Sequence, residues 1–154
     1  MKAFQEYYSE EFSHCYGCGT AHPTGFKVKS FWLDEQAGTT IAHFTPDEQF
    51  TGGFPQNVYG GLIAAILDCH GNGTAYAAGY EHFGRTMGSA PHLRYVTANL
   101  NLNFLAPTPI GERLELRGII KEITDKKVVM ELQLWTKEKL RVSGTMVSVL
   151  LPPK

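Results

Sequence analysis

The sequence predicts an α+β domain in which one long apolar helix lies on an antiparallel sheet of about six strands. The first observation behind this prediction is a single stretch, residues 57–78, that is long and apolar enough to form a buried helix. The second is the chain after it, where runs with strand character are separated by short polar turns. With 154 residues, 43% of them hydrophobic, the chain is expected to form a single domain over residues 1–154.

The first half of the chain is expected to contain two strands and then the helix. Residues 1–13 are acidic and aromatic, and they predict a short helix or an N-terminal arm. After a turn-rich segment that starts at Cys15, residues 26–33 and 39–44 form a predicted hairpin broken by a polar turn. Asn57 is the expected N-cap of the helix. Glycine lowers helix stability, so a close approach by another surface is expected at Gly60, Gly61, Gly71 and Gly73.

The second half of the chain is expected to be strand throughout. Residues 94–105 alternate strictly, which predicts one apolar and one polar face. The apolar face carries Val96, Ala98, Leu100, Leu102 and Phe104. The polar face carries Thr97, Asn99, Asn101 and Asn103. Short turns then separate three more predicted strands, at residues 114–123, 128–135 and 140–150.

Charge and cysteine content exclude several classes of protein. The formal net charge of −1 gives no reason to expect a nucleic acid or an anionic membrane as partner. No apolar run approaches the roughly 18 residues of a membrane span, and the first residues lack the apolar centre of a signal peptide. Three cysteines do not make a disulfide framework. We therefore expect a soluble cytoplasmic protein with no membrane insertion.

A carboxylate stands at the centre of the predicted helix. Asp68 follows six consecutive apolar residues, 62–67. An ionised aspartate is rarely buried without a partner, because removing its charge from water is costly. Asp68 is therefore expected to face a cleft and take part in chemistry. The alternative is a buried aspartate whose side chain holds loop backbone in place.

Three segments of the chain resemble the hotdog-fold acyl-CoA thioesterases of the PaaI-like group. The helix opens with Tyr59-Gly-Gly and carries Asp68 nine positions after Tyr59, where the family has His-Gly-Gly and an acidic residue at the same spacing. Residues 96–107 are similar to the family strand that follows the helix and ends in proline. The segment Cys15-Tyr-Gly-Cys-Gly is similar to one that precedes the first strand in many members. Tyr59 in place of histidine is a departure that concerns the substrate more than the fold.

The resemblance implies a hotdog fold and hydrolysis of an acyl-CoA thioester without a cofactor. This reaction needs a group that activates water and donors that hold the developing oxyanion. The free N–H groups of a helix N-terminus can donate at Gly60 and Gly61, and Asp68 can act as general base or nucleophile. The resemblance places Thr97 at the position of a Ser or Thr that binds the attacking water.

The spacing of these groups predicts an active site shared between two chains. Gly61 and Asp68 are seven residues apart in the helix, or about 10 Å, so one helix cannot bring both to the same carbonyl. Two antiparallel helices related by a two-fold axis can do so, which predicts a homodimer or a dimer of dimers. We expect the substrate to contact Asn57, Val58 and Tyr59 at the start of the helix and Asn72 on the Asp68 face.

A metal site and a catalytic thiol are weighed and set aside. Cys15 and Cys18 with His14 or His22 form half of a zinc site, but no second cysteine pair follows at the usual spacing, so no metal is expected. Cys69 and His70 are adjacent on the helix and therefore point about 100° apart, which excludes a pair. His70 is expected near the mouth of the site.

Two other functions stay open alongside hydrolysis. A hotdog hydratase acting on an enoyl or β-hydroxyacyl thioester would need a histidine beside the carboxylate, for which His70 is the nearby candidate. A non-catalytic acyl-CoA-binding protein is the other, suggested by Tyr59 and by Gly53, where some members of the family have Asn or Gln. Release of free thiol from a panel of acyl-CoA substrates separates hydrolysis from both.

Overall fold

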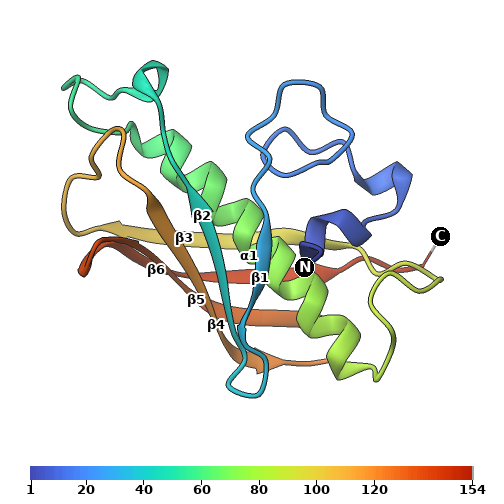
Figure 1. Cartoon of the computed structure of the whole chain (residues 1–154). Coiled ribbons are helices and arrows are strands. Elements are labelled where there is room, and N and C mark those ends of the chain that lie inside the picture. The colour runs from blue at the N-terminus through green and yellow to red at the C-terminus, as the bar shows by residue number, and fades with distance from the viewer. Residues whose placement is uncertain (154) are drawn as a thin grey trace.

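The computed structural model describes residues 1–153 and shows one long helix, α1 (Gly60–His82), against a six-stranded antiparallel sheet (Figure 1). The strands are β1 (Ser30–Asp34), β2 (Thr39–Phe44), β3 (Tyr95–Phe104), β4 (Leu114–Ile123), β5 (Lys127–Thr136) and β6 (Lys139–Leu150). Their order in the sheet is β1-β2-β4-β5-β6-β3, with every neighbouring pair antiparallel. The predicted α+β class, with one helix on about six strands, is confirmed.

The core lies between α1 and the inner face of the sheet. The helix contributes Leu62, Ile66 and Leu67, all fully buried, because its sequence is apolar around almost its whole circumference. Alternate residues of β4, β5 and β6 point toward it and are fully buried as well, as period-two alternation requires. The sheet side of the core includes Leu114, Leu116, Met130, Leu132, Leu134, Val142 and Met146.

At Gly71 and Gly73, distant parts of the chain approach α1 closely, as predicted, whereas only an ordinary contact is made at Gly60 and the neighbouring Tyr59 ring lies at Gly61. A Cβ at Gly71 would lie 2.2 Å from Met146 Sδ and 3.4 Å from Leu132 Cδ1. A Cβ at Gly73 would lie 2.4 Å from Gln5 Nε2. The missing side chains let β6 and the N-terminal segment pack directly on the helix backbone.

Replacing Gly71 with alanine is expected to lower the free energy of unfolding by about 1–2 kcal/mol, because overpacking against buried Met146 outweighs the better helix propensity of alanine. Gly60→Ala is the matched control: its Cβ would meet only the Phe104 ring, at 3.6 Å, an ordinary contact. Urea denaturation of both variants measures the difference. Equal stability for Gly71→Ala and wild type would show that Met146 moves aside freely.

The helix begins and ends later than the sequence indicated. Residues 57–59 are extended, since Val58 N–H donates to the Thr108 carbonyl and Tyr59 N–H to the Phe50 carbonyl. Tyr59, and not Asn57, is therefore the N-cap residue. At the other end the helix continues past Ala78 to His82, and Gly84, with φ +60°, stops it.

The N-terminal segment, predicted as a short helix or an arm, forms two 3-10 turns, Phe4–Tyr7 and Glu10–Phe12, beside the middle of α1 (Figure 1). Its Gln5 is buried and donates to Ser30 Oγ at 2.9 Å. The first strand is shorter than the predicted 26–33. Residues 26–29 instead follow the turn around Cys15, where Phe26 N–H donates to the Tyr16 carbonyl.

Strand β3 contains a β-bulge that changes which residues face the helix. Thr97 pairs with Ser148 and Asn99 with Val147, so Ala98 is an extra residue without a partner on β6. Residues directly opposite on neighbouring strands share a face. Because Ser148 lies on the inner face of β6, the bulge puts Thr97 on the inner face too, with Leu100 beyond it.

The strict alternation predicted for β3 is therefore wrong on one side of Ala98. Thr97 does not share a face with the three asparagines. All four side chains are exposed, but Thr97 points toward α1, where it donates to Asp68, and the asparagines lie on the other face of the strand.

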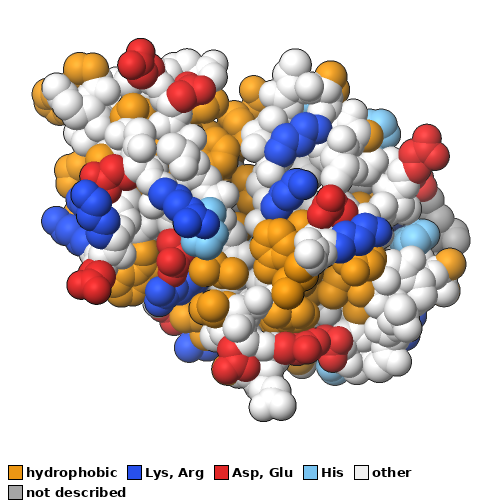
Figure 2. All heavy atoms as spheres, in the orientation of Figure 1, with side chains coloured by type: hydrophobic (Ala, Val, Ile, Leu, Met, Phe, Trp, Pro, Cys, Tyr) orange, Lys and Arg blue, Asp and Glu red, His pale blue; other side chains and the backbone are white. Residues whose placement is uncertain are grey.

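The surface is mixed in charge. On the face shown in Figure 2, Lys and Arg side chains are interspersed with Asp and Glu side chains and with hydrophobic ones. Within residues 1–153, no helix combines the length and the hydropathy that crossing a membrane requires.

Candidate active site

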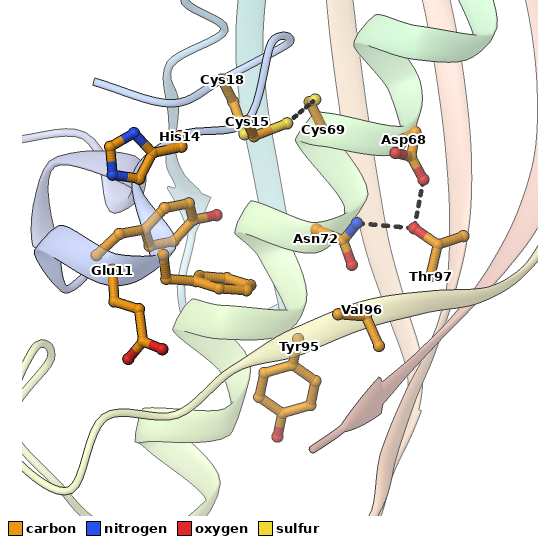
Figure 3. Close-up of a pocket in the computed structure, with 12 residues that line it drawn as sticks. Glu11, His14, Cys15, Cys18, Asp68, Cys69, Asn72, Tyr95, Val96 and Thr97 are labelled. Atoms are coloured by element: carbon orange, nitrogen blue, oxygen red, sulfur yellow. Dashed lines mark hydrogen bonds between the residues drawn. The ribbon is translucent and has the colours of Figure 1, made fainter. Parts of the chain in front are cut away.

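Asp68 lies at the end of a chain of hydrogen bonds that joins α1 to strands β3 and β6. Figure 3 shows the two bonds that connect Asp68, Thr97 and Asn72. Thr97 Oγ1 donates to Asp68 Oδ1 in a short hydrogen bond. Asn72 Nδ2 donates to Thr97 Oγ1 at 2.8 Å, and Ser148 Oγ donates to Asn72 Oδ1 at 2.8 Å. Since an amide NH₂ can only donate, it obliges Thr97 to direct its own proton at the carboxylate. The chain thus fixes the rotamer of Asp68 and the direction of each bond.

The surroundings of Asp68 make it more basic than an exposed aspartate. Burial raises the pKa of its carboxyl, the hydrogen bond from Thr97 opposes this rise, and negative charge on Cys15 adds to it. A carboxylate with a raised pKa accepts a proton from water more readily, which suits a general base.

Asp68, Asn72 and Thr97 line one cavity of about 400 Å³. The cavity is also lined by residues that the sequence did not associate with the site: Tyr8, Glu11, Phe12, His14, Cys15, Cys18, Cys69, Tyr95 and Val96. Six of these nine come from the N-terminal segment and the turn after it, residues 8–18, which have no periodic pattern or spacing that relates them to the helix. The packing of that segment beside α1 supplies one wall of the cavity.

The predicted residues at the start of the helix lie in a different cavity. Asn57, Val58, Tyr59 and Gly60 line a space of about 560 Å³ that also includes Phe104 at the end of β3. Gly61 follows directly, and the Tyr59 ring lies over it, since a Cβ there would be 2.7 Å from Tyr59 Cε2. The structure therefore divides the predicted site residues of one chain into two groups, at positions about 10 Å apart along α1.

Cys69 and His70 point in different directions, as predicted, but His70 does not lie near a mouth of the site. It is fully buried, and its Nδ1 and Nε2 lie 2.8 Å from Ser30 Oγ and 3.2 Å from Thr40 Oγ1. Burial lowers its pKa to about 3, so the ring is neutral and structural. His70 is two positions after Asp68, so the two side chains leave α1 on different sides. That of His70 lies on the side of α1 that faces the sheet.

Three thiols gather on one wall of the Asp68 cavity. Cys15 and Cys18 come from the turn before β1, and Cys69 comes from α1 next to Asp68 (Figure 3). Their sulfur atoms all lie within 4.8 Å of one another. In the sequence, the spacing relates only Cys15 and Cys18 to each other, so it could not identify Cys69 as the third thiol of the cluster.

Solved structures similar to this one include thioesterase-superfamily proteins. A thioesterase superfamily protein from Shewanella loihica PV-4 is 43% identical over 94% of this chain and 100% of its own, with a TM-score of 0.69. The PaaI protein from the phenylacetic acid degradation operon of E. coli has a TM-score of 0.62 at 15% identity, with 84% of this chain and 83% of its own covered. A Streptococcus mutans protein bound to acetyl CoA has a TM-score of 0.65 at 12% identity, with 82% and 90% covered.

No curated protein sequence matches the chain, but a family model does. The model of the thioesterase superfamily matches residues 55–143, which include α1 and the whole of strands β3, β4 and β5. With more than half of the chain matched and a 43% identical relative, the protein belongs to the thioesterase superfamily, whose hotdog fold it shares.

Proposed function

We propose that the protein hydrolyses an acyl-CoA thioester to the free acid and CoA. The observation that carries this proposal is the orientation of Asp68, an acidic side chain on an apolar helix held in a cavity by Thr97 and Asn72. Asp68 Oδ2, which takes no part in that chain of hydrogen bonds, removes a proton from a water molecule. The water oxygen then attacks the thioester carbonyl.

The start of α1 supplies the donors for the oxyanion. The first N–H groups of a helix have no partner within it and carry partial positive charge, so they stabilise negative charge nearby. Gly60 is exposed and has no side chain to keep a carbonyl away. Preorganised backbone donors of this kind contribute about 3–4 kcal/mol each to acyl transfer.

The base and the donors of one site come from two chains. Strand β3 is at the edge of the sheet, with β6 on one side only, and ten residues of its backbone are available for pairing. Antiparallel pairing of β3 with its copy would set two α1 helices side by side in opposite directions. The Asp68 cavity of one chain would then face the Gly60 end of the other.

The position of exposed apolar side chains supports the same assembly. Phe54, Tyr59, Phe104 and Leu105 are all well exposed, and all line the cavity at the start of α1. Apolar groups gathered in this way indicate a surface that a ligand or another chain covers. A homodimer, or a dimer of dimers, buries them.

The proposed substrate is a coenzyme A ester, because proteins of the same fold have been solved with acetyl CoA or coenzyme A bound. The S. mutans protein was solved with acetyl CoA, and a Streptococcus pneumoniae TIGR4 protein with coenzyme A. Free thiol release from a panel of short, long and aryl acyl-CoA substrates tests the proposal. Turnover of at least one ester is expected, and no turnover with any of them would contradict it.

The buried position of His70 argues against the hydratase alternative. Both of its ring nitrogens lie against Ser30 and Thr40, so it cannot assist Asp68. His14 is the histidine that lines the Asp68 cavity. If the protein causes loss of enoyl absorbance with an enoyl-CoA, and His14→Gln abolishes this loss, hydration is favoured. Binding of acyl-CoA without turnover would favour a non-catalytic protein.

Tyr59→Phe is expected to lower kcat far less than Asp68→Asn, because the oxyanion donors are backbone N–H groups. The variant keeps the ring that lies over Gly61 and removes only the hydroxyl. Initial rates with the best ester of the panel measure the effect. A loss as large as that of Asp68→Asn would mean that the phenol itself donates to the intermediate.

A further inference from the structure

The three thiols on the wall of the Asp68 cavity form a compact cluster that thioester hydrolysis does not use. Cys15 Sγ lies 3.7 Å from Cys69 Sγ, and the sulfurs of all three cysteines lie within 4.8 Å of one another. A tetrahedral Zn²⁺ with Zn–S bonds of about 2.3 Å holds its sulfurs about 3.8 Å apart. One pair is therefore already at the required separation, and Cys18 needs a shift of about 1 Å at most.

The backbone around the cluster is shaped to hold the sulfurs there. The Gly19 N–H donates to the Cys15 carbonyl at 2.7 Å, which closes the turn that carries Cys15 and Cys18. A Cβ at Gly17 would lie 2.1 Å from Cys69 Sγ, so only glycine lets the turn reach the helix. A Cβ at Gly19 would lie 2.5 Å from the Cys15 nitrogen. Both glycines are needed for this turn to meet α1.

We propose that Cys15, Cys18 and Cys69 bind one Zn²⁺ ion per chain. Each coordinating thiol releases its proton to solvent as it becomes a thiolate. Thiolate ligands select soft or borderline metals, and a near-tetrahedral sulfur arrangement suits zinc. A water molecule would complete the four ligands that zinc prefers, since Asp68 is held toward Thr97 (Figure 3) and is not one of the three clustered residues.

The ion would tie the segment before β1 to the middle of α1. Cys15 and Cys18 are joined to the N-terminal 3-10 turns, which supply Tyr8 and Phe12 to the cavity, whereas Cys69 adjoins Asp68. Metal binding would therefore hold the wall of the cavity against the helix. This role does not depend on which reaction the protein catalyses.

Metal content of the full-length protein tests the proposal without an activity assay. After purification under reducing conditions and reconstitution with Zn²⁺, one zinc per chain is expected by mass spectrometry of the metals. The Co²⁺-substituted protein should show the sulfur-to-cobalt charge-transfer bands of a tetrahedral thiolate site. Cys69→Ala should lower zinc affinity by at least about 100-fold and abolish these bands. Cys15→Ser, at an exposed position, should do the same if Cys69→Ala does not fold.

His22→Gln is the matched control, since His22 lies in the same segment but outside the cluster. It should keep full zinc content, and chelation should lower the Tm of this variant as it does that of the wild type. The proposal is overturned if the reduced wild type takes up no zinc, or if Cys69→Ala binds it equally well. It is also overturned if non-reducing peptide mapping finds Cys15 and Cys69 as a disulfide and reduction does not restore zinc uptake.

Discussion

Asp68→Asn is expected to lower kcat for acyl-CoA hydrolysis by a factor of about 10² or more, which is the usual cost of losing a general base. Asparagine has nearly the same shape, and its Oδ1 can still accept the hydrogen bond from Thr97. The variant should therefore fold normally, with a Tm close to that of the wild type. Initial rates and thermal unfolding together separate a chemical effect from a structural one.

The control for this prediction is Asp125→Asn. Asp125 is a highly exposed carboxylate that pairs with His82 and does not line the cavity, so its loss should not change kcat. If Asp68→Asn keeps wild-type kcat, Asp68 is not the base. If it unfolds while Asp125→Asn does not, Asp68 serves mainly to hold α1 against β3.

Mixing two inactive variants is expected to restore activity. Asp68→Asn removes the base, and Gly60→Val blocks the donor end of the helix with a branched side chain whose Cβ would meet only the Phe104 ring. In a mixed dimer, one shared site carries both defects and the other carries neither. Co-refolding should therefore recover up to about half of the wild-type activity per heterodimer, if the two sites act independently.

Verified heterodimers are essential to this test, and two affinity tags on the two variants provide them. Each variant refolded with itself is the control and should stay inactive. Heterodimers with no activity would contradict the shared site. A fully active monomer in sedimentation at assay concentration would contradict it as well.

The arrangement of helix and strands could be predicted from the sequence because it depends on strong local patterns. The run before Asp68 is apolar on every side, and five of the six strands have bounds within one residue of those predicted from their alternation and turns. The helix ends were less well predicted. Its start is set by hydrogen bonds from Val58 and Tyr59 to distant loops, which no local signal reveals.

The site was predicted less completely than the fold, because parts of it depend on contacts between distant segments. Alternation alone put Thr97 on the same face as Asn99, and only the family resemblance associated it with Asp68. No glycine or proline marks the bulge at Ala98 that turns it inward. No local pattern relates Cys69 to Cys18 either, since 51 positions separate them. Tertiary packing brings Thr97 to Asp68 and Cys69 to Cys18.

The bulge at Ala98 lets one strand make two kinds of contact with α1. Pairing with β6 continues on both sides of the extra residue. Thr97 and Leu100 therefore both face the helix, although three positions separate them and regular alternation would turn them to opposite faces. One strand can in this way offer a hydroxyl to the acid and, a few residues later, an apolar side chain to the core.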